Sequence, residues 1–223
     1  MRMDTVNRYR QRRGRVIARL IAAVSAQLGR AIDILDVGGR EDYWRNVDCT
    51  GVRRITLLNL SETELRREQG PEGGPEFASM IGDARDLSRD FADGAVDFVH
   101  ANSVIEHVGA WDDMSAMARE LARVGRSGWC QTPAWAFPIE PHFRAPFLHW
   151  FGQPLRARMM GLSRGYRGLD LSQRRHHIDR INLLSGAEMR VLFPGKSIHT
   201  ERVFGWPKSY SAFWGPADTA ATG

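Results

Sequence analysis

The sequence predicts an α/β fold, in which a mostly parallel seven-stranded sheet is covered by helices on both faces and ends in an antiparallel strand pair. Two observations predict it. Short apolar runs typical of buried strands alternate with helical patterns along the chain, and this order of elements builds a parallel sheet. The last two apolar runs, 197–204 and 209–214, follow each other across a short turn, as the strands of an antiparallel pair do.

The first predicted element is an amphipathic helix that occupies residues 1–30, with its regular part over 5–29. Apolar residues recur there at helical spacing, and Gly29 marks the end. The helix is rich in arginine, but so is the whole chain, because only Lys196 and Lys208 among the 31 basic residues are lysines. We therefore interpret its basic side as a solvated face. Binding to an anionic substrate, nucleic acid or membrane headgroups is the alternative.

The remaining elements are expected within a single domain over 31–223. Its first five strands are predicted at 34–37, 54–61, 77–82, 95–101 and 128–133. Helices are predicted after the capping box at 61–64, near Ser103, over 112–124 and after the capping box at 185–188. Residues 134–180 are rich in proline and aromatic residues and show no regular period, so we interpret them as a lid insertion.

The composition of the chain limits the classes of protein to which it can belong. The chain has 223 residues, of which 43% are hydrophobic and 26% charged, a balance typical of soluble globular domains. No apolar run approaches the roughly 20 residues that a membrane helix needs. Cys49 and Cys130 form no disulfide or zinc pattern, so a cytoplasmic location is expected.

Polar residues and glycines stand where the predicted parallel strands end. These positions are Gly38–Arg40, Asn59, Asp83 and His100–Ser103. Ligands of open parallel sheets bind beyond the carboxyl ends of the strands, so we expect a ligand site there. The paired glycines at 38 and 39 would let the backbone approach a ligand without a clash from Cβ.

Four motifs in order carry a family resemblance: ILDVGGRED (34–42), LLNLS (57–61), GDARDL (82–87) and FVHANSVIEHV (98–108). Together with ARELARVGRSGWCQTPA, they resemble the glycine-rich loop and the following strand ends of the Rossmann-like class I S-adenosylmethionine-dependent methyltransferases. The resemblance covers residues 30–134. It extends less specifically through FPIEPHFRAPFLHWF and the C-terminal runs, which are similar to runs in bacterial methyltransferases.

The resemblance implies S-adenosylmethionine as cofactor and S-adenosylhomocysteine as product. It places the amino-acid end of the cofactor against Gly38 and Gly39, with Asp36 near the ammonium group. Arg40 is assigned either to the carboxylate or to a solvated loop. The cofactor residues expected in this way are Asp36, Gly38, Gly39, Arg40, Asn59, Leu60, Asp83, Ala84, Asn102 and Ser103.

Two departures from the family pattern stand in the cofactor loops. The family commonly has a further glycine where Arg40 to Asp42 stand, which predicts a differently shaped loop. Asn59 stands where the family usually has an acidic residue that holds the ribose hydroxyls. A carboxylate forms stronger hydrogen bonds than a neutral amide, so the sequence predicts modest affinity and tighter binding in Asn59→Asp.

Methyl transfer also needs an acceptor and, for a hydroxyl, removal of its proton. We expect the acceptor to be an oxygen or nitrogen of a small molecule or saccharide. His142 is the predicted general base, His107 is the second candidate, and Glu140 lies two residues before His142 in FPIEPHF. The alternative for His107 is a capping and packing role. The chain shows no cluster of metal ligands at the usual spacing, so we expect transfer without a metal.

Other functions are weighed against the same residues. A dinucleotide cofactor is disfavoured because Glu41 and Asp42 would face its pyrophosphate. A nucleic-acid methyltransferase or binder is the main alternative, although the chain has no basic patch interleaved with aromatic residues. An enzyme that uses S-adenosylmethionine in a non-methylating reaction is a third hypothesis. Peripheral membrane contact through residues 2–28 is left open, and the oligomeric state is not predicted.

Overall fold

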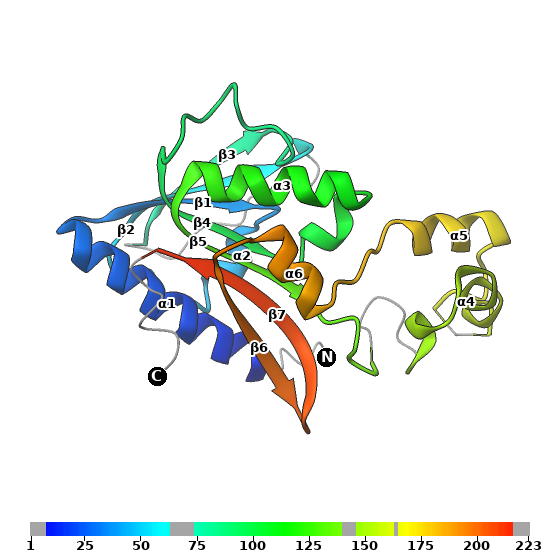
Figure 1. Ribbon diagram of the computed structural model, residues 1–223. Helices are drawn as coiled ribbons and strands as arrows, with labels where there is room; N and C mark the ends of the chain where they lie inside the picture. The colour runs from blue at the N-terminus through cyan, green and yellow to red at the C-terminus, as the bar shows by residue number, and fades with distance from the viewer. Residues whose placement is uncertain (1–7, 63–73, 140–145, 163–164, 216–223) are drawn as a thin grey trace, which may run out of the picture.

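The computed structural model describes residues 8–62, 74–139, 146–162 and 165–215. These residues form one seven-stranded sheet with the strand order β3-β2-β1-β4-β5-β7-β6 (Figure 1). The strands are β1 (Ile32–Val37), β2 (Val52–Asn59), β3 (Glu76–Ile81), β4 (Val96–Asn102), β5 (Gly125–Pro133), β6 (Ser197–Val203) and β7 (Trp206–Trp214). Strands β1 to β5 pair in parallel, whereas β7 runs antiparallel to both of its neighbours. The predicted fold class is confirmed.

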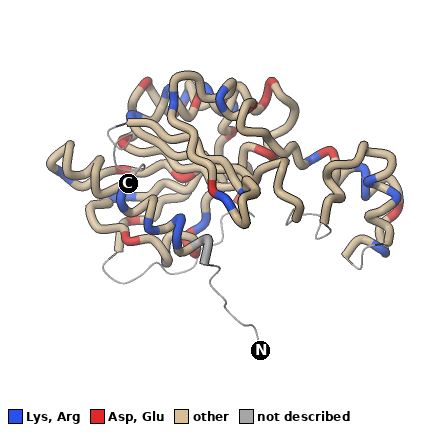
Figure 2. The backbone as a smooth tube through the Cα atoms, turned by 60° about the horizontal axis from the view of Figure 1, so that its bottom comes forward, with Lys and Arg blue, Asp and Glu red and all other residues tan. Residues whose placement is uncertain are grey.

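Helix α1 (Arg8–Leu28) and the single-turn helix α2 (Glu41–Trp44) cover one face of the sheet. The apolar side of α1 packs on β1, β2 and β4 and is fully buried, with Ile17, Leu20, Ile21 and Val24 at its centre. Apart from Leu28 at its end, this helix therefore presents its polar side to the surroundings. Basic and acidic residues are spread over the whole described chain rather than gathered on α1 (Figure 2).

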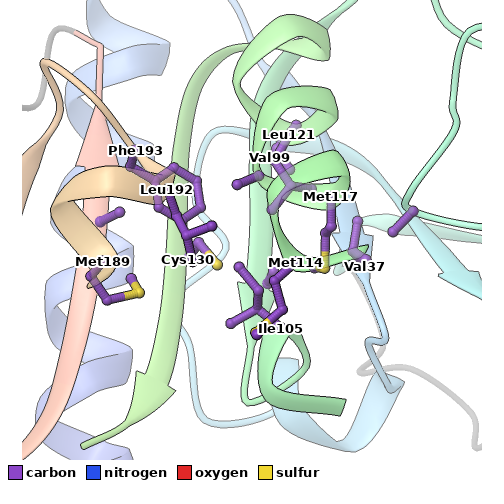
Figure 3. Close-up of a cluster of buried hydrophobic side chains, with 14 of the residues drawn as sticks. Val37, Val99, Ile105, Met114, Met117, Leu121, Cys130, Met189, Leu192 and Phe193 are labelled. Atoms are coloured by element: carbon purple, nitrogen blue, oxygen red, sulfur yellow. The ribbon is translucent and has the colours of Figure 1, made fainter. Parts of the chain in front are cut away.

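Helices α3 (Trp111–Val124) and α6 (Gly186–Leu192) cover the opposite face. Their methionine and leucine side chains, together with Phe193 just after α6, meet residues of β4 and β5, including Val99 and Cys130 (Figure 3). Helix α6 begins at the predicted capping box. There Ser185 Oγ accepts from the Glu188 backbone N–H, and a Glu188 carboxylate oxygen accepts from the Ser185 N–H. Both faces of the central strands are thus buried, as their continuous apolar runs require.

The segment predicted as an irregular lid contains regular structure. It holds the 3₁₀ turn η3 (Leu148–Trp150) and the helices α4 (Gln153–Met160) and α5 (Leu171–Asp179), which lie to one side of the sheet (Figure 1). These elements share a small core of their own, made of Leu148, Ala157, Met160, Ile178 and Ile181. The two helices are short and bury few apolar residues, so the sequence gives no clear helical period here.

Three local expectations have different outcomes. The helix predicted near Ser103 is wrong: Ser103 has φ 57°, its N–H donates to the Gln131 carbonyl, and only the 3₁₀ turn η2 (Ile105–His107) follows. The helix predicted after Ser61 falls on residues 63–73, which lie outside the described residues. The final hairpin turns at Phe204 and Gly205, so Pro207 stands inside β7 rather than in the turn.

Within the described ranges, no helix is both long and apolar enough to cross a membrane.

Candidate functional site

Two cavities adjoin at the carboxyl ends of the parallel strands, with Val37 and Gly38 in the walls of both. The first, of about 290 Å³, lies between the β1–α2 loop and the end of β4. The second, of about 210 Å³, lies between the ends of β2 and β3 and the turn η2. The first is lined by Asp36, Gly38, Gly39, Arg40, Asn102 and Ser103, and the second by Gly38, Asn59, Leu60, Asp83 and Ala84, together with other residues. The structure thus brings together all ten residues that the sequence predicted for the cofactor.

The paired glycines are required by the chain's own packing. Gly38 has φ +66°, and a Cβ there would lie 2.5 Å from a methyl group of Val104. At Gly39 a Cβ would overlap the carboxylate of Asp36. The sequence argument gave only one reason for bare glycines, the approach of a ligand to the backbone. The structure adds a second reason, because a side chain at either position would push the loop away from β1 and η2.

Asn59 joins the end of β2 to the glycine loop. Its Nδ2 donates a hydrogen bond to the Gly39 carbonyl at 3.0 Å, and the residue is 7% exposed. The side-chain oxygen keeps its capacity to accept a hydrogen bond from a ligand. An aspartate could not make the bond to Gly39, because an ionised carboxylate only accepts hydrogen bonds.

Asp83 follows β3 and forms a compact ion pair. The Arg85 guanidinium donates to its carboxylate at 2.6 Å and to Asp113 on α3 at 2.8 Å. The hydrogen bond from Arg85 lowers the pKa of Asp83 below its usual value. Asp83 is therefore a carboxylate at neutral pH and can accept a hydrogen bond from a ligand.

A buried polar group lies beneath the first cavity. Asp36 and His100 are neighbours on β1 and β4, and Asp36 Oδ1 accepts from His100 Nδ1 at 2.6 Å. The second oxygen of Asp36 accepts from Trp44 Nε1 at 2.7 Å. His100 is 1% exposed, and its Nε2 has no hydrogen-bond partner among the described residues. The Tyr43 ring lies 4.9 Å from the His100 ring, measured between centroids.

Sequence reasoning placed Asp36 and His100 near the ligand but missed Trp44 and Tyr43. The available signal is that Asp36 and His100 are polar residues inside otherwise apolar strand runs. Such residues need buried partners. The partner Trp44 comes from a helix of one turn, whose packing the sequence pattern does not specify.

Arg40 lines the first cavity but pairs with Asp42, to which its Nε donates at 2.9 Å. Both side chains are 45% exposed, so the pair is solvated. The structure is thus compatible with both assignments made from the sequence.

The predicted catalytic residues are only partly described. His142 and Glu140 lie outside the described residues, in the segment 140–145. His107 lines the second cavity, and its Nδ1 lies 3.2 Å from the Arg180 carbonyl. Its neighbour Glu106 is fully buried and accepts from Thr132 Oγ1 at 3.0 Å, which is a packing role. Across the described ranges, no three His, Cys, Asp or Glu side chains gather closely enough to hold a metal ion.

One arginine of the first helix points into the protein, so the interpretation of a solvated basic face is wrong for Arg13. Its guanidinium donates to Asn102 Oδ1 at 2.8 Å and to Gln131 Oε1 at 2.9 Å. It also pairs with Glu201 of β6 at 3.3 Å, and the two side chains are only about 15% exposed. Arg13 thus connects α1 to the ends of β4 and β5, beside the first cavity.

Comparison with known proteins supports the methyltransferase resemblance found in the sequence. Residues 35–129 match the model of a methyltransferase domain family. None of the curated proteins compared with the chain matches its sequence. Among solved structures, the PH0226 protein from Pyrococcus horikoshii OT3 is similar, with 16% identity and a TM-score of 0.52 over 92% of this chain and 91% of that one. A SAM-dependent methyltransferase from Archaeoglobus fulgidus is also similar, with 10% identity and a TM-score of 0.51 over 87% of this chain and 91% of that one. At these identities, the solved structures show the fold.

The strand order, the glycine loop at the end of β1 and the methyltransferase-domain match over residues 35–129 support a class I methyltransferase. They support an enzyme that uses S-adenosylmethionine as its cofactor.

Proposed function

We propose that this enzyme transfers the methyl group to an oxygen or nitrogen of a small molecule or saccharide. The observation that carries the proposal is a third cavity of about 380 Å³ between the lid and α3. This volume is within the range of small-molecule sites. The segment 180–182 joins it to the second cavity, because Arg180 lines the second cavity and Asn182 the third.

The lining of the third cavity suits a polyhydroxylated or aromatic acceptor. Trp111 and Trp135 contribute aromatic faces, on which a sugar or phenol ring can pack. Gln153, Arg156 and Glu188 contribute hydrogen-bonding side chains. The exposed wall of this cavity is more polar than apolar, which suits a hydroxylated acceptor better than a purely apolar one.

The residues around the first two cavities fit the cofactor, which supplies a methyl group on a sulfonium centre when bound. The glycine loop would hold the amino-acid end, and Asn59 Oδ1 would accept from a ribose hydroxyl. Asp83 would accept from the adenine amino group, between Leu60 and Ala84. S-adenosylmethionine carries no phosphate, so the nearby carboxylates of Glu41 and Asp42 do not oppose it.

Asp36 would act on the ammonium group through His100 or water rather than directly. Both of its oxygens already accept hydrogen bonds, and the residue is 1% exposed. Asn102 and Ser103 would line the methionine side, where they already form the wall of the first cavity.

His142 remains the proposed general base, with His107 as the second candidate and Glu140 as a supporting carboxylate. The position of His107 favours a role near the reaction, since it lines the cofactor cavity and contacts the Arg180 carbonyl beside the third cavity. His142→Ala should lower turnover far more than cofactor affinity, whereas equal losses in both would show that it binds rather than takes a proton.

Calorimetric titration with S-adenosylhomocysteine tests the cofactor site. We expect binding to the wild type and weaker binding to Asp83→Asn. The matched control is Asp93→Asn, because Asp93 also pairs with an arginine but lies on an exposed turn away from the cavities. Folded protein that gives no heat, or equal affinity in both variants, contradicts the assignment.

Transfer of labelled methyl groups to pools of saccharides, phenols and RNA tests the acceptor class. Trp111→Ala should raise the KM for the acceptor and leave the dissociation constant of S-adenosylhomocysteine unchanged. Leu171→Ala, on an exposed position of α5 outside the cavity, is the control. Label that appears only in RNA would favour the nucleic-acid alternative instead.

A further inference from the structure

The β6–β7 hairpin ends in a residue that neither packing nor turn geometry explains. Val203 pairs with Trp206, so the turn consists of Phe204 and Gly205, whose φ values of 48° and 84° are those of a type I′ turn. The first position of such a turn favours asparagine, aspartate or glycine. Here it holds a phenylalanine that is 99% exposed. The chain thus places a large apolar side chain in water, on a backbone conformation that disfavours it.

Further exposed aromatic residues continue from this turn. Trp206, Phe147 and Trp135 are 46–47% exposed, and the Trp150 ring lies between them. The Trp150 centroid is 6.0 Å from that of Trp206, 5.0 Å from that of Phe147 and 6.3 Å from that of Trp135. Phe147 also has a left-handed backbone, with φ 61°. In the part of the chain that the structure describes, two of the three non-glycine residues with positive φ are therefore exposed phenylalanines on this one face.

Basic side chains accompany the aromatic ones. Arg202 is exposed, and its Nη1 donates to the Gly205 carbonyl at 3.0 Å, which fixes the guanidinium at the hairpin turn. Lys208 follows on β7 and is half-buried, and the exposed Arg12 of α1 lines the same surface cleft as Arg202. The neighbouring acidic residue, Glu201, already pairs with Arg13 and accepts from Ser209 Oγ at 2.8 Å. The charge presented by this region is therefore positive.

We propose that Phe204, Trp206, Phe147, Trp135 and Trp150, together with Arg202 and Lys208, form a docking surface for a membrane with anionic lipids. We call these residues the hairpin surface. Tryptophan and phenylalanine partition into the interface between headgroups and acyl chains, and arginine and lysine attract anionic headgroups. The hairpin, which carries Phe204, Trp206 and Arg202, extends beyond the rest of the sheet (Figure 1). The lid residues of the surface join it through the contact between the Trp150 and Trp206 rings.

Membrane contact through the hairpin surface differs from contact through the first helix. The apolar side of α1 is buried on the sheet and cannot enter a lipid phase without unfolding, whereas Phe204 is already exposed. The surface also adjoins the carboxyl edge of the sheet, since Trp135 follows β5 and lines the third cavity. If the proposed function holds, docking would bring that cavity next to an acceptor carried by a lipid. The docking itself does not depend on methyl transfer.

Cosedimentation of the full chain with vesicles tests this proposal without cofactor or acceptor. Vesicles of phosphatidylcholine alone are compared with vesicles that also contain phosphatidylglycerol. We expect binding to the mixed vesicles that weakens as salt is added. Phe204→Asn should lower the partition coefficient at least about tenfold, because it removes the most exposed apolar side chain. Its melting temperature should stay equal or rise, because Asn-Gly suits the turn.

The matched control is Val191→Asn, which removes an exposed apolar side chain from α6, outside the hairpin surface. Its partition coefficient should equal that of the wild type. Failure of the wild type to bind mixed vesicles, or equal losses in both variants, overturns the proposal. Equal binding to neutral and mixed vesicles overturns the role of Arg202 and Lys208. A concentration-dependent dimer that Phe204→Asn abolishes, without vesicle binding, would instead assign the surface to a second copy of the chain.

Discussion

Asn59→Asp separates two roles that this side chain combines at the end of β2. The amide nitrogen donates to the Gly39 carbonyl at 3.0 Å, and the amide oxygen is the proposed acceptor for a ribose hydroxyl. From the sequence alone, the change should tighten cofactor binding, because a carboxylate accepts more strongly than an amide. The structure adds an opposing effect, since the same carboxylate would face the Gly39 carbonyl instead of donating to it.

The two effects have similar magnitudes. A hydrogen bond to a charged group contributes about 1.5–3 kcal/mol, against about 0.5–1.5 kcal/mol for a neutral one, so the ribose contact gains roughly 1 kcal/mol. Loss of the bond leaves the half-buried Gly39 carbonyl without this donor, which costs at most about 1–3 kcal/mol. That penalty falls on the loop that would hold the amino-acid end of the cofactor. We therefore expect the free energy of unfolding to fall by at most about 1–3 kcal/mol.

Two ligands distinguish the contributions by calorimetry. Methylthioadenosine carries the nucleoside but lacks the amino-acid end, so its affinity should rise about fivefold in Asn59→Asp. S-adenosylhomocysteine needs the glycine loop as well, and its affinity should stay equal or fall. Asn59→Ala, which removes the amide without adding charge, is the control and should weaken both ligands. If S-adenosylhomocysteine tightens as much as methylthioadenosine, the bond between Asn59 and Gly39 does not position the loop.

Three further results are expected. Gly39→Ala should lower the free energy of unfolding by roughly 2 kcal/mol or more, because a Cβ there overlaps the Asp36 carboxylate. The melting temperature should fall by at least about 4 °C. An unchanged melting curve would contradict this packing. Burial lowers the pKa of Lys208 to about 8, so more of its amine is uncharged at pH 8. An amine-reactive ester at that pH should modify Lys208 faster than Lys196, as measured by peptide mass spectrometry. Equal rates would show that the amine of Lys208 is not perturbed. Arg13→Gln should destabilise the protein by roughly 2 kcal/mol or more in urea unfolding, because it removes the guanidinium that pairs with the largely buried Glu201. The added change Glu201→Gln should recover part of the loss, and no recovery would place the effect elsewhere.

The carboxyl edge of the sheet could be predicted from the sequence because its signals are local. A buried strand gives a continuous apolar run, and the residue after it is identified by its position alone. Gly38, Asn59 and Asp83 were placed in this way, and the structure brings them to two adjoining cavities. Topology supplies the long-range part of the inference, since the ends of parallel strands meet at one edge whatever the loops contain.

The partners of these residues could not be predicted, because they depend on packing between distant segments. The sequence separates Asp36 from His100 by 64 positions and Arg13 from Gln131 by 118. Nothing in the spacing of such residues reports the register of β1 against β4 or the angle at which α1 crosses the sheet. The contact between Asn59 and Gly39 belongs to the same group, and it changes the expected effect of Asn59→Asp.

Arginine is usually exposed and aromatic residues are usually buried, and particular positions of this chain depart from that behaviour in opposite directions. Arg13 was assigned to a solvated face but is largely buried, because β4 and β5 offer amide oxygens at the place where α1 begins its contact with the sheet. Phe147 and Phe151 are large apolar residues of the lid, a type that is usually buried, yet both are more than a third exposed. Burial follows from the partners that the fold provides, not from residue type. A residue whose exposure contradicts its type is therefore informative only once those partners are known, which is why Phe204 becomes a candidate contact in the structure and not in the sequence.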